Sequence, residues 1–266
     1  MIIYNYGLVF VYFTPKGATL KILLLDIETS PNVAHVWGIW QQNVGLSQLL
    51  ESSYTMCYSA KWLGEETVYF DSVYGSTSKS MLEGIHGLLD DADAVCHYNG
   101  TKFDMPTLNK EFLLHKMTPP PPMKQIDLLR VVKSQFRFPS NKLDYVAQRL
   151  GLGKKKEHEG HTLWIKCMAN DKKAWATMKE YNIQDVLLLE KLYNRLLPWI
   201  KTPVNMALMK DRDGFVCPTC AKPSLISKGF RYTATGAYQR YQCKACGAYS
   251  TDTRTVIPHA KLKHLA

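Results

Sequence analysis

The chain has 266 residues, of which 46% are hydrophobic and 21% charged, and its formal net charge is +10. This composition is typical of a globular protein, and the length allows one full domain and a smaller unit. No apolar run reaches the roughly 20 residues needed to span a bilayer. Residues 1–13 are apolar but lack the basic start and the cleavage site of a signal peptide. We therefore expect a cytoplasmic protein without membrane contact, in which residues 1–20 form an arm or an extra strand.

The cysteines and the basic charge are unevenly distributed. Four of the seven cysteines form two Cys-x-x-Cys pairs near the C-terminus, which indicates a reducing compartment and a metal site rather than disulfides. Cys57, Cys96 and Cys167 lie in apolar segments and are most simply core residues. Residues 1–200 carry 22 Lys and Arg against 20 Asp and Glu, whereas residues 201–266 carry 11 against 3. The basic C-terminal part indicates a polyanionic partner.

The first clear element is a buried strand that ends in two acids. Residues 22–25 are consecutive apolar residues, and Asp26 and Glu28 follow them. Alternate residues of a strand share a face, so both carboxylates should point the same way. They repel each other unless a cation lies between them, and Mg²⁺ and Mn²⁺ prefer such oxygen ligands. The alternative is a strand end whose acids face water.

The next elements predict a mixed sheet flanked by helices. Residues 54–62 and 67–74 are rich in β-branched and aromatic residues and flank a turn, so they predict strands antiparallel to the first. A helix capped by Ser78 or Ser80 should then lead to a strand at residues 94–98, parallel to the first. Together these elements predict an α/β fold.

The second acidic stretch follows that strand. Asn99-Gly100 makes a sharp exit from the strand, and the apolar pattern after Asp104 predicts a helix. Asp104 therefore lies at a strand-to-helix junction, where ligands gather in sheets with crossover helices. The alternative is that it caps the helix. Ile126-Asp127 is a short apolar step into a further helix, with Asp127 as its cap.

A helix, a loop and a long helix complete this part of the chain. Residues 140–151 predict the helix, and residues 154–161 predict a polar, mobile loop whose two histidines are solvated. Residues 172–200 are amphipathic and predict one long helix or two end to end. Tyr181 and Asp185 are four residues apart on it, so they face the same side. Apolar neighbours surround Asp185, whose charge is costly there unless it is paired or bound to a cation.

Three acidic motifs thus occur in a fixed order. They are Asp-x-Glu on a strand, Asn-x-x-x-Phe-Asp at a strand-to-helix junction and Tyr-x-x-x-Asp on a late helix. Residues 21–200 carry them and resemble the DEDD exonucleases of the ribonuclease H-like superfamily. Within this group the chain is similar to the tyrosine-bearing DEDDy subclass, which includes the proofreading domains of family B DNA polymerases and stand-alone relatives. The histidine subclass has a His five positions before the last Asp, where this chain has Glu180.

The resemblance implies a metal-dependent 3′-5′ exonuclease that acts on DNA, with single-stranded 3′ ends as its substrate. It further implies two catalytic Mg²⁺ or Mn²⁺ ions that clamp the attacking and leaving oxygens of a phosphodiester. The implied ligands are Asp26, Glu28, Asp104 and Asp185. Among them Asp26 would bridge both ions, Glu28 and Asp185 would complete the site that activates water, and Asp104 would help to hold the second ion.

The resemblance also implies contacts with the substrate. Tyr181 would orient the attacking water, because a phenol with a pKa of about 10 is a poor base at neutral pH. The residues implied to bind the terminal nucleotides are Thr29, Asn99, Lys102 and Phe103. Phe103 could stack on a base, although an apolar residue at the start of a helix also commonly packs into the core.

The cysteine pairs predict a second, smaller unit at residues 201–266. Cys217-x-x-Cys220 and Cys243-x-x-Cys246 are separated by 22 residues, which fits one structural Zn²⁺ in a tetrahedral Cys₄ site. This unit resembles zinc ribbons, with strands expected within residues 229–241. Cations and aromatics are interleaved there and could bind phosphates and bases, or the aromatics could merely cover the zinc. The interleaved residues are Arg231, Tyr232, Tyr238, Arg240, Tyr241 and Tyr249.

Alternatives to the exonuclease remain open at this point. One is a catalytically inactive nucleic-acid-binding protein on the same fold, against which the presence of all four acids and Tyr181 argues. Others are an RNA-directed exonuclease and a structure-specific endonuclease. A nuclease fused to a small module suits a virus or mobile element in a bacterial or phage-infected cell, where a replication or repair complex could be its partner.

Overall fold

The computed structural model describes residues 20–201, 203–208, 215–234 and 236–257. They belong to two compact units, one formed by Lys21–Val204 and one that contains the described residues from Asn205 onward. The expected N-terminal arm or strand lies outside the described residues except for its last residue. Within the described part of the chain, every helix is too short or too polar to cross a membrane.

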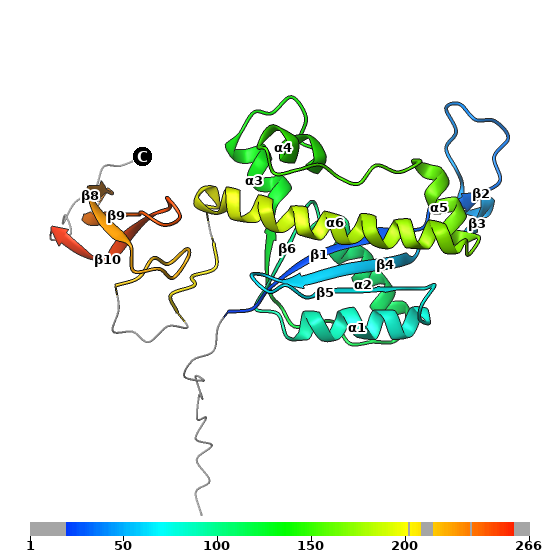
Figure 1. Ribbon diagram of the computed structural model, residues 1–266, viewed down its shortest axis with the longest axis horizontal. Helices are drawn as coiled ribbons and strands as arrows, with labels where there is room; N and C mark the ends of the chain where they lie inside the picture. Colours follow the sequence, from blue (N-terminus) through cyan, green and yellow to red (C-terminus); the bar gives the residue numbers. More distant parts are fainter. Residues whose placement is uncertain (1–19, 202, 209–214, 235, 258–266) are drawn as a thin grey trace, which may run out of the picture. The chain divides into compact units, whose positions relative to one another are not determined.

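The larger unit is built on a five-stranded mixed sheet with the strand order β5-β4-β1-β6-β7 (Figure 1). Its strands are β1 (Ile22–Thr29), β4 (Thr55–Trp62), β5 (Val68–Ser72), β6 (Ala94–His97) and β7 (Lys124–Asp127). β4 is antiparallel to β1 and β5, whereas β6 is parallel to β1 and β7. The predicted sheet is confirmed. The short step into a helix predicted at residues 126–127 is instead the end of a fifth strand, whose exposed Lys124 and Gln125 hide its character in the sequence.

Helices cover both faces of this sheet. They are α1 (Ser78–Asp90), α2 (Asp104–Leu114), α3 (Leu128–Gln135), α4 (Leu143–Arg149), α5 (His161–Met168) and α6 (Lys172–Leu196). α1 and α2 lie on one face, and the long α6 crosses the other (Figure 1). Leu23, Leu25 and Ile27 of β1 pack with α1 and α2 in the main core. Since side chains alternate along a strand, Asp26 and Glu28 are turned toward the opposite face.

Several local predictions differ from the structure. α1 is capped by Thr77, whose hydroxyl accepts from the Ser80 backbone N–H at 3.1 Å, and not by Ser78 or Ser80. The segment after β1 contains a short ribbon, β2 (Val33–Ala34) and β3 (Leu49–Glu51), that the sequence pattern does not reveal. Between these two strands the side chains of Trp37 and Trp40 are 99% and 80% exposed.

The smaller unit contains an antiparallel sheet of three strands in the order β10-β9-β8. They are β8 (Leu225–Tyr232), β9 (Ala237–Cys243) and β10 (Tyr249–Ile257). Strands within residues 229–241 are therefore confirmed, and β10 is an additional strand. One Cys-x-x-Cys segment lies before β8, and the other begins at Cys243, the last residue of β9, and continues toward β10.

The backbone at Gly100, shortly after the end of β6, packs closely against a buried side chain. Its N–H donates to Nδ1 of the buried His97 at 3.0 Å, and a Cβ at this position would lie 2.4 Å from His97 Cγ. We predict that G100A lowers the free energy of unfolding by about 1–3 kcal/mol because of this overlap. In the control G87A, the new Cβ meets no atom within 4 Å on α1, so stability should rise by about 0.5–1 kcal/mol. Urea unfolding measures both changes, and a G100A variant as stable as wild type would contradict the prediction.

Candidate active site

Three carboxylates from two elements meet between β1 and α6. Asp26 and Glu28 are half-buried on β1, and Asp185 on α6 is only 1% exposed. One carboxylate oxygen from each of the three lies within 4.8 Å of the other two. Asp185 therefore does not face solvent, and the strand acids point toward the helix.

Asp104 lies beside this cluster but is not one of the three grouped acids. It is the buried first residue of α2, and its Oδ1 accepts from the Ile27 backbone N–H of β1 at 3.2 Å. The N-cap of α2 is Phe103, so the alternative that Asp104 is the cap is wrong. The charge of Asp104 contributes to raising the pKa of Asp26 and Glu28. Asp127, in contrast, does cap its helix and accepts from the backbone of Leu129 at 3.0 Å.

Burial and mutual repulsion make these acids hard to ionise together. Burial is the main cause that raises the pKa of Asp26, and the charges of the neighbouring acids add to it. Burial also raises the pKa of Glu28 to about 8 and that of Asp104 to about 7. The pKa of Asp185 is raised by burial as well. A cation placed among these oxygens would remove the repulsion.

A lysine from the loop between α4 and α5 supplies part of that positive charge. Lys155 Nζ donates to Asp185 Oδ2 at 2.5 Å and to the Tyr181 hydroxyl at 3.0 Å. Its backbone N–H donates to Asp144 Oδ1 at 2.7 Å, which ties the loop to α4. Burial opposes its charge, but Asp185 and Asp26 raise the pKa of Lys155 and keep it protonated. Lys155 was not singled out from the sequence, in which the run of three lysines at 154–156 was the available signal.

Aromatic rings close one side of the cluster. The ring centroid of His158 lies 4.7 Å from that of Tyr181 and 5.2 Å from that of Trp164. The Trp164 side chain partly opposes the rise of the Glu28 pKa. The phenol of Tyr181 is buried, and burial together with Asp185 raises its pKa. Tyr181 therefore stays protonated at neutral pH.

A cavity of about 610 Å³ opens beside the acids. Its walls include Asp26 and Asn99, so one of the four nucleotide-binding residues implied by the sequence faces it. Lys133, Asn141 and Lys142 also line it and were not expected from the sequence. The sequence indicates these three residues only weakly, because Asn141 and Lys142 belong to a short polar stretch before α4 and Lys133 lies on the amphipathic helix α3.

The other implied substrate residues do not line this cavity. Phe103 is 43% exposed beside Asp104, so the alternative that it packs into the core is wrong. Lys102 is exposed next to it, and Thr29 is the half-buried last residue of β1. All three nevertheless lie next to an acid of the site in the sequence. Thr29 directly follows Glu28, and Lys102 and Phe103 directly precede Asp104.

The acid cluster fits a divalent cation. It offers carboxylate oxygens, which Mg²⁺ and Mn²⁺ prefer as ligands. Moreover, Asp185 Oδ1 is buried and has no hydrogen-bond partner among the described residues. Buried polar atoms are normally satisfied, so an unpaired carboxylate oxygen in such a cluster is an available ligand.

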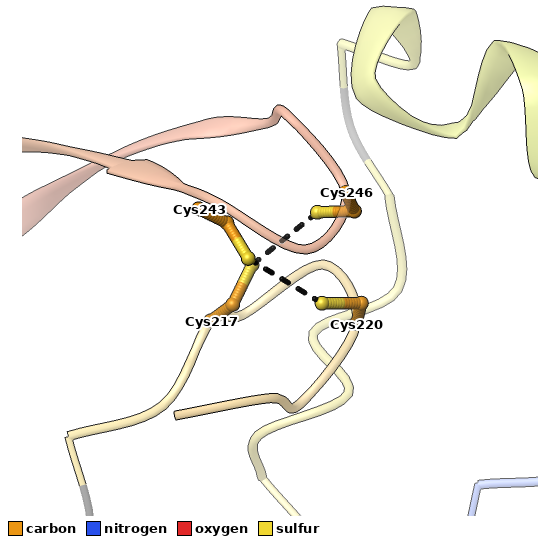
Figure 2. Close-up of side chains that lie close together, drawn as sticks. All are labelled: Cys217, Cys220, Cys243 and Cys246. Atoms are coloured by element: carbon orange, nitrogen blue, oxygen red, sulfur yellow. Dashed lines mark hydrogen bonds between the residues drawn. The ribbon is translucent and has the colours of Figure 1, made fainter. Parts of the chain in front are cut away.

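The smaller unit holds the second candidate metal site, formed by four cysteines (Figure 2). Their sulfur atoms lie within 4.8 Å of one another, and all four thiols are free. The Cys217–Cys246 and Cys220–Cys243 sulfur distances are 3.8 and 3.7 Å. A tetrahedron with Zn–S bonds of about 2.3 Å has edges of about 3.8 Å, so the sulfur positions fit Zn²⁺.

Backbone amides also favour thiolates at this site. The Thr219 N–H donates to Cys217 Sγ at 3.4 Å. Burial raises the pKa of Cys220 and Cys246, and neighbouring backbone N–H groups partly oppose that rise. Although burial opposes ionisation, the N–H groups of Cys246 and Ala245 lower the pKa of Cys243 to about 7. Thiolates are the form in which cysteine binds metal.

Comparisons with known proteins agree with this architecture. Residues 23–197 match the profile of the RNase_H superfamily, and the chain belongs to this superfamily. Among solved structures, the family B DNA polymerase from the hyperthermophilic archaeon Pyrobaculum calidifontis shares its fold, with a TM-score of 0.54 and 18% sequence identity. That match covers 68% of this chain but 25% of the polymerase chain. No match was found among curated proteins.

The raised pKa values predict how the stability of the metal-free protein depends on pH. Glu28 and Asp104 bind protons more tightly in the folded state, with pKa values of about 8 and about 7 against ordinary values of 4.5 and 3.8. The folding stability that this tighter proton binding contributes is fully present below the ordinary pKa values and is lost as the pH rises through the raised pKa values. We therefore predict that the thermal midpoint in buffer free of Mg²⁺ and Mn²⁺ falls from about pH 5 to about pH 8.

The variant E28Q is the matched control for this pH dependence. Its neutral amide cannot titrate, so its midpoint should fall less over the same range, and added Mg²⁺ should reduce the fall in wild type. Thermal melts at a series of pH values give both curves. A wild-type thermal midpoint that rises with pH relative to that of E28Q would show that folding does not raise the pKa of these acids.

Proposed function

We propose that this chain is a metal-dependent 3′-5′ exonuclease that hydrolyses phosphodiester bonds from single-stranded 3′ ends of DNA. The observation that carries the proposal is the convergence of Asp26, Glu28 and Asp185 within 4.8 Å, one helical turn from Tyr181. These residues have the order and spacing of the DEDDy exonucleases, which they resemble. Membership in the RNase_H superfamily supports nuclease chemistry in general.

The acids would hold two Mg²⁺ or Mn²⁺ ions, with Asp104 beside the three grouped carboxylates. When bound, such ions lower the pKa of a water and offset charge on the attacking and leaving oxygens of the phosphodiester. Tyr181 would position the attacking water, because its raised pKa keeps the phenol neutral. Lys155 keeps both Tyr181 and Asp185 in place through its ammonium group.

The cavity beside the acids would receive the end of the nucleic-acid strand. Lys133 and Lys142 line it and would attract phosphates, while Asn99 lines it together with Asp26. Phe103 is exposed at the start of α2 and would stack on a base, a contact that every base sequence tolerates. Lys102 and Thr29 would add contacts next to these acids.

We also propose that residues 201–266 form a zinc ribbon that binds nucleic acid. Directly paired residues of neighbouring strands share a face, so Arg231 lies on the same face as Tyr238. Arg240 belongs to that face, and its guanidinium lies 5.8 Å from the centre of the Tyr249 ring. This face combines cations with aromatic rings, as surfaces that bind single strands do. A reducing compartment such as the bacterial cytoplasm would keep its cysteines available for Zn²⁺.

The opposite face of the ribbon serves another purpose. Tyr241 lies on it, and its ring packs against Phe215 near the first cysteine pair, with centroids 4.7 Å apart. Tyr232 pairs with Ala237 and shares this face. Of the aromatics in the predicted surface, Tyr241 would therefore cover the cysteine site, whereas Tyr238 and Tyr249 would contact nucleic acid.

Substitution of the clustered acids tests the chemistry. We predict that D26N and D185N each lower the rate of hydrolysis at least about 10³-fold, since each loses a metal ligand worth several kcal/mol in the transition state. Y181F, which keeps the ring but loses the hydroxyl, should be roughly 10²-fold slower. The control E180Q changes an exposed acid on the same helix that pairs with Lys156 and should keep full activity.

The assay follows 5′-labelled single-stranded DNA, duplex DNA and RNA with Mg²⁺ or Mn²⁺ and with a chelator. A 3′-5′ exonuclease shortens the labelled strand progressively and leaves a circular single strand intact. Cleavage of the circle would instead indicate an endonuclease, and metal-independent binding without products an inactive binding protein. Full activity in D26N or D185N would rule out the proposed site.

Loss of the cysteines tests the ribbon. We predict one Zn²⁺ per chain in wild type and none in the double variant C217S/C243S, whose KM on long single strands should rise roughly 10²-fold because the second binding unit is lost. The rate at saturating substrate should change little, since the acids are untouched. The control C167A alters a buried core cysteine and should retain zinc. Zinc bound to the double variant, or an unchanged KM, would refute the assignment.

A further inference from the structure

One neutral side chain of α6 points into the acid cluster. Asn182 is 0% exposed and lies between Tyr181 and Asp185 on the helix. Its Nδ2 donates to Asp26 Oδ2 at 2.7 Å and lies 3.4 Å from the backbone oxygen of the same residue. The amide of Asn182 therefore joins α6 to β1 at Asp26.

The surroundings fix the orientation of this amide. The backbone oxygen and the Oδ2 of Asp26 both accept hydrogen bonds, so the NH₂ group of Asn182 must face them. Its Oδ1 accepts from the thiol of Cys57, whose sulfur lies 3.9 Å away. Cys57 stands opposite Glu28 in the pairing of β4 with β1. A chain of hydrogen bonds thus runs from β4 through α6 to the Asp26 carboxylate.

The hydrogen bond has a consequence for Asp26. A hydrogen bond to one carboxylate oxygen fixes the rotation of the group and leaves the other oxygen available to a ligand. This effect acts before any cation binds, so it would prepare the site.

We propose that Asn182 is a positioning residue for the divalent-cation site and that it holds the Asp26 carboxylate in the orientation that binds Mg²⁺ or Mn²⁺. This inference rests on the proposed function, because it assumes that the acid cluster binds these ions. Residues that orient metal ligands typically contribute 10–100-fold to metal affinity. A purely structural role would instead affect folding and leave the affinity for the ion unchanged.

Mn²⁺ binding to the full, zinc-loaded chain separates the two roles. The free ion is measured by electron paramagnetic resonance for wild type, N182L and N182A at a temperature well below each thermal midpoint. Leu approximates the volume of Asn without its donor, and Ala provides a second variant if Leu does not fit. The control W175F removes another buried hydrogen bond of α6, from Trp175 Nε1 to the Cys167 backbone oxygen at 2.9 Å.

We expect both Asn182 variants to bind Mn²⁺ about 10–100-fold more weakly than wild type, and W175F to bind it normally even if it melts earlier. A folded N182L or N182A with wild-type affinity would overturn the inference. An equal loss of affinity in W175F would also overturn it, because the effect would then reflect a loosened core. If wild-type chain and D26N both fail to bind Mn²⁺, the proposed function itself fails and this inference with it.

Discussion

The structure depends on holding together carboxylates that repel one another. Asp26 and Asp185 come from elements far apart in the sequence, yet their oxygens lie within 4.8 Å with that of Glu28. Such an arrangement persists only if the backbone beneath it is rigid. β1 supplies that rigidity, because Leu23 and Leu25 are completely buried between α1 and α2 on one side while α6 covers the other. The hydrophobic core therefore stabilises a site that would be unfavourable by itself.

Three of the four acids are also matched with a hydrogen-bond donor of a different kind. The pairs are Asp26 with Asn182, Asp104 with the Ile27 backbone and Asp185 with Lys155. These donors come from a helix, a strand and a loop, and only that of Lys155 is a full positive charge. The charge of the cluster is thus reduced but not neutralised, which leaves it able to attract a divalent cation. An acid cluster neutralised by several lysines would bind metal less tightly.

The sequence predicted those parts of the site that depend on local periodicity. Asp26 and Glu28 share a face because a strand repeats every two residues, and Asp185 follows Tyr181 by one turn of a helix. Lys155 could not be predicted in this way, because its position depends on how an irregular loop folds back over α6. Asn182 has no distinguishing pattern either, since a single Asn within a helix gives no sign of which buried group it will meet. The donors of this site are set by tertiary packing, whereas its acids are set by secondary structure.

A metal ion would have a different purpose at each of the two candidate sites. In the described part of the smaller unit, the buried hydrophobic residues are Cys217, Ala221, Ala237, Cys243 and Ala248, which are all small. This small buried apolar surface cannot stabilise the smaller unit by itself. A bound Zn²⁺ would therefore provide most of the folding free energy of that unit. The larger unit has an extensive core of Leu, Ile, Met and aromatic side chains and does not need a cation to fold. Cations bound at its acid cluster could therefore be exchanged without unfolding it, whereas a metal bound by the four cysteines would have to stay in place for as long as the smaller unit is to remain folded.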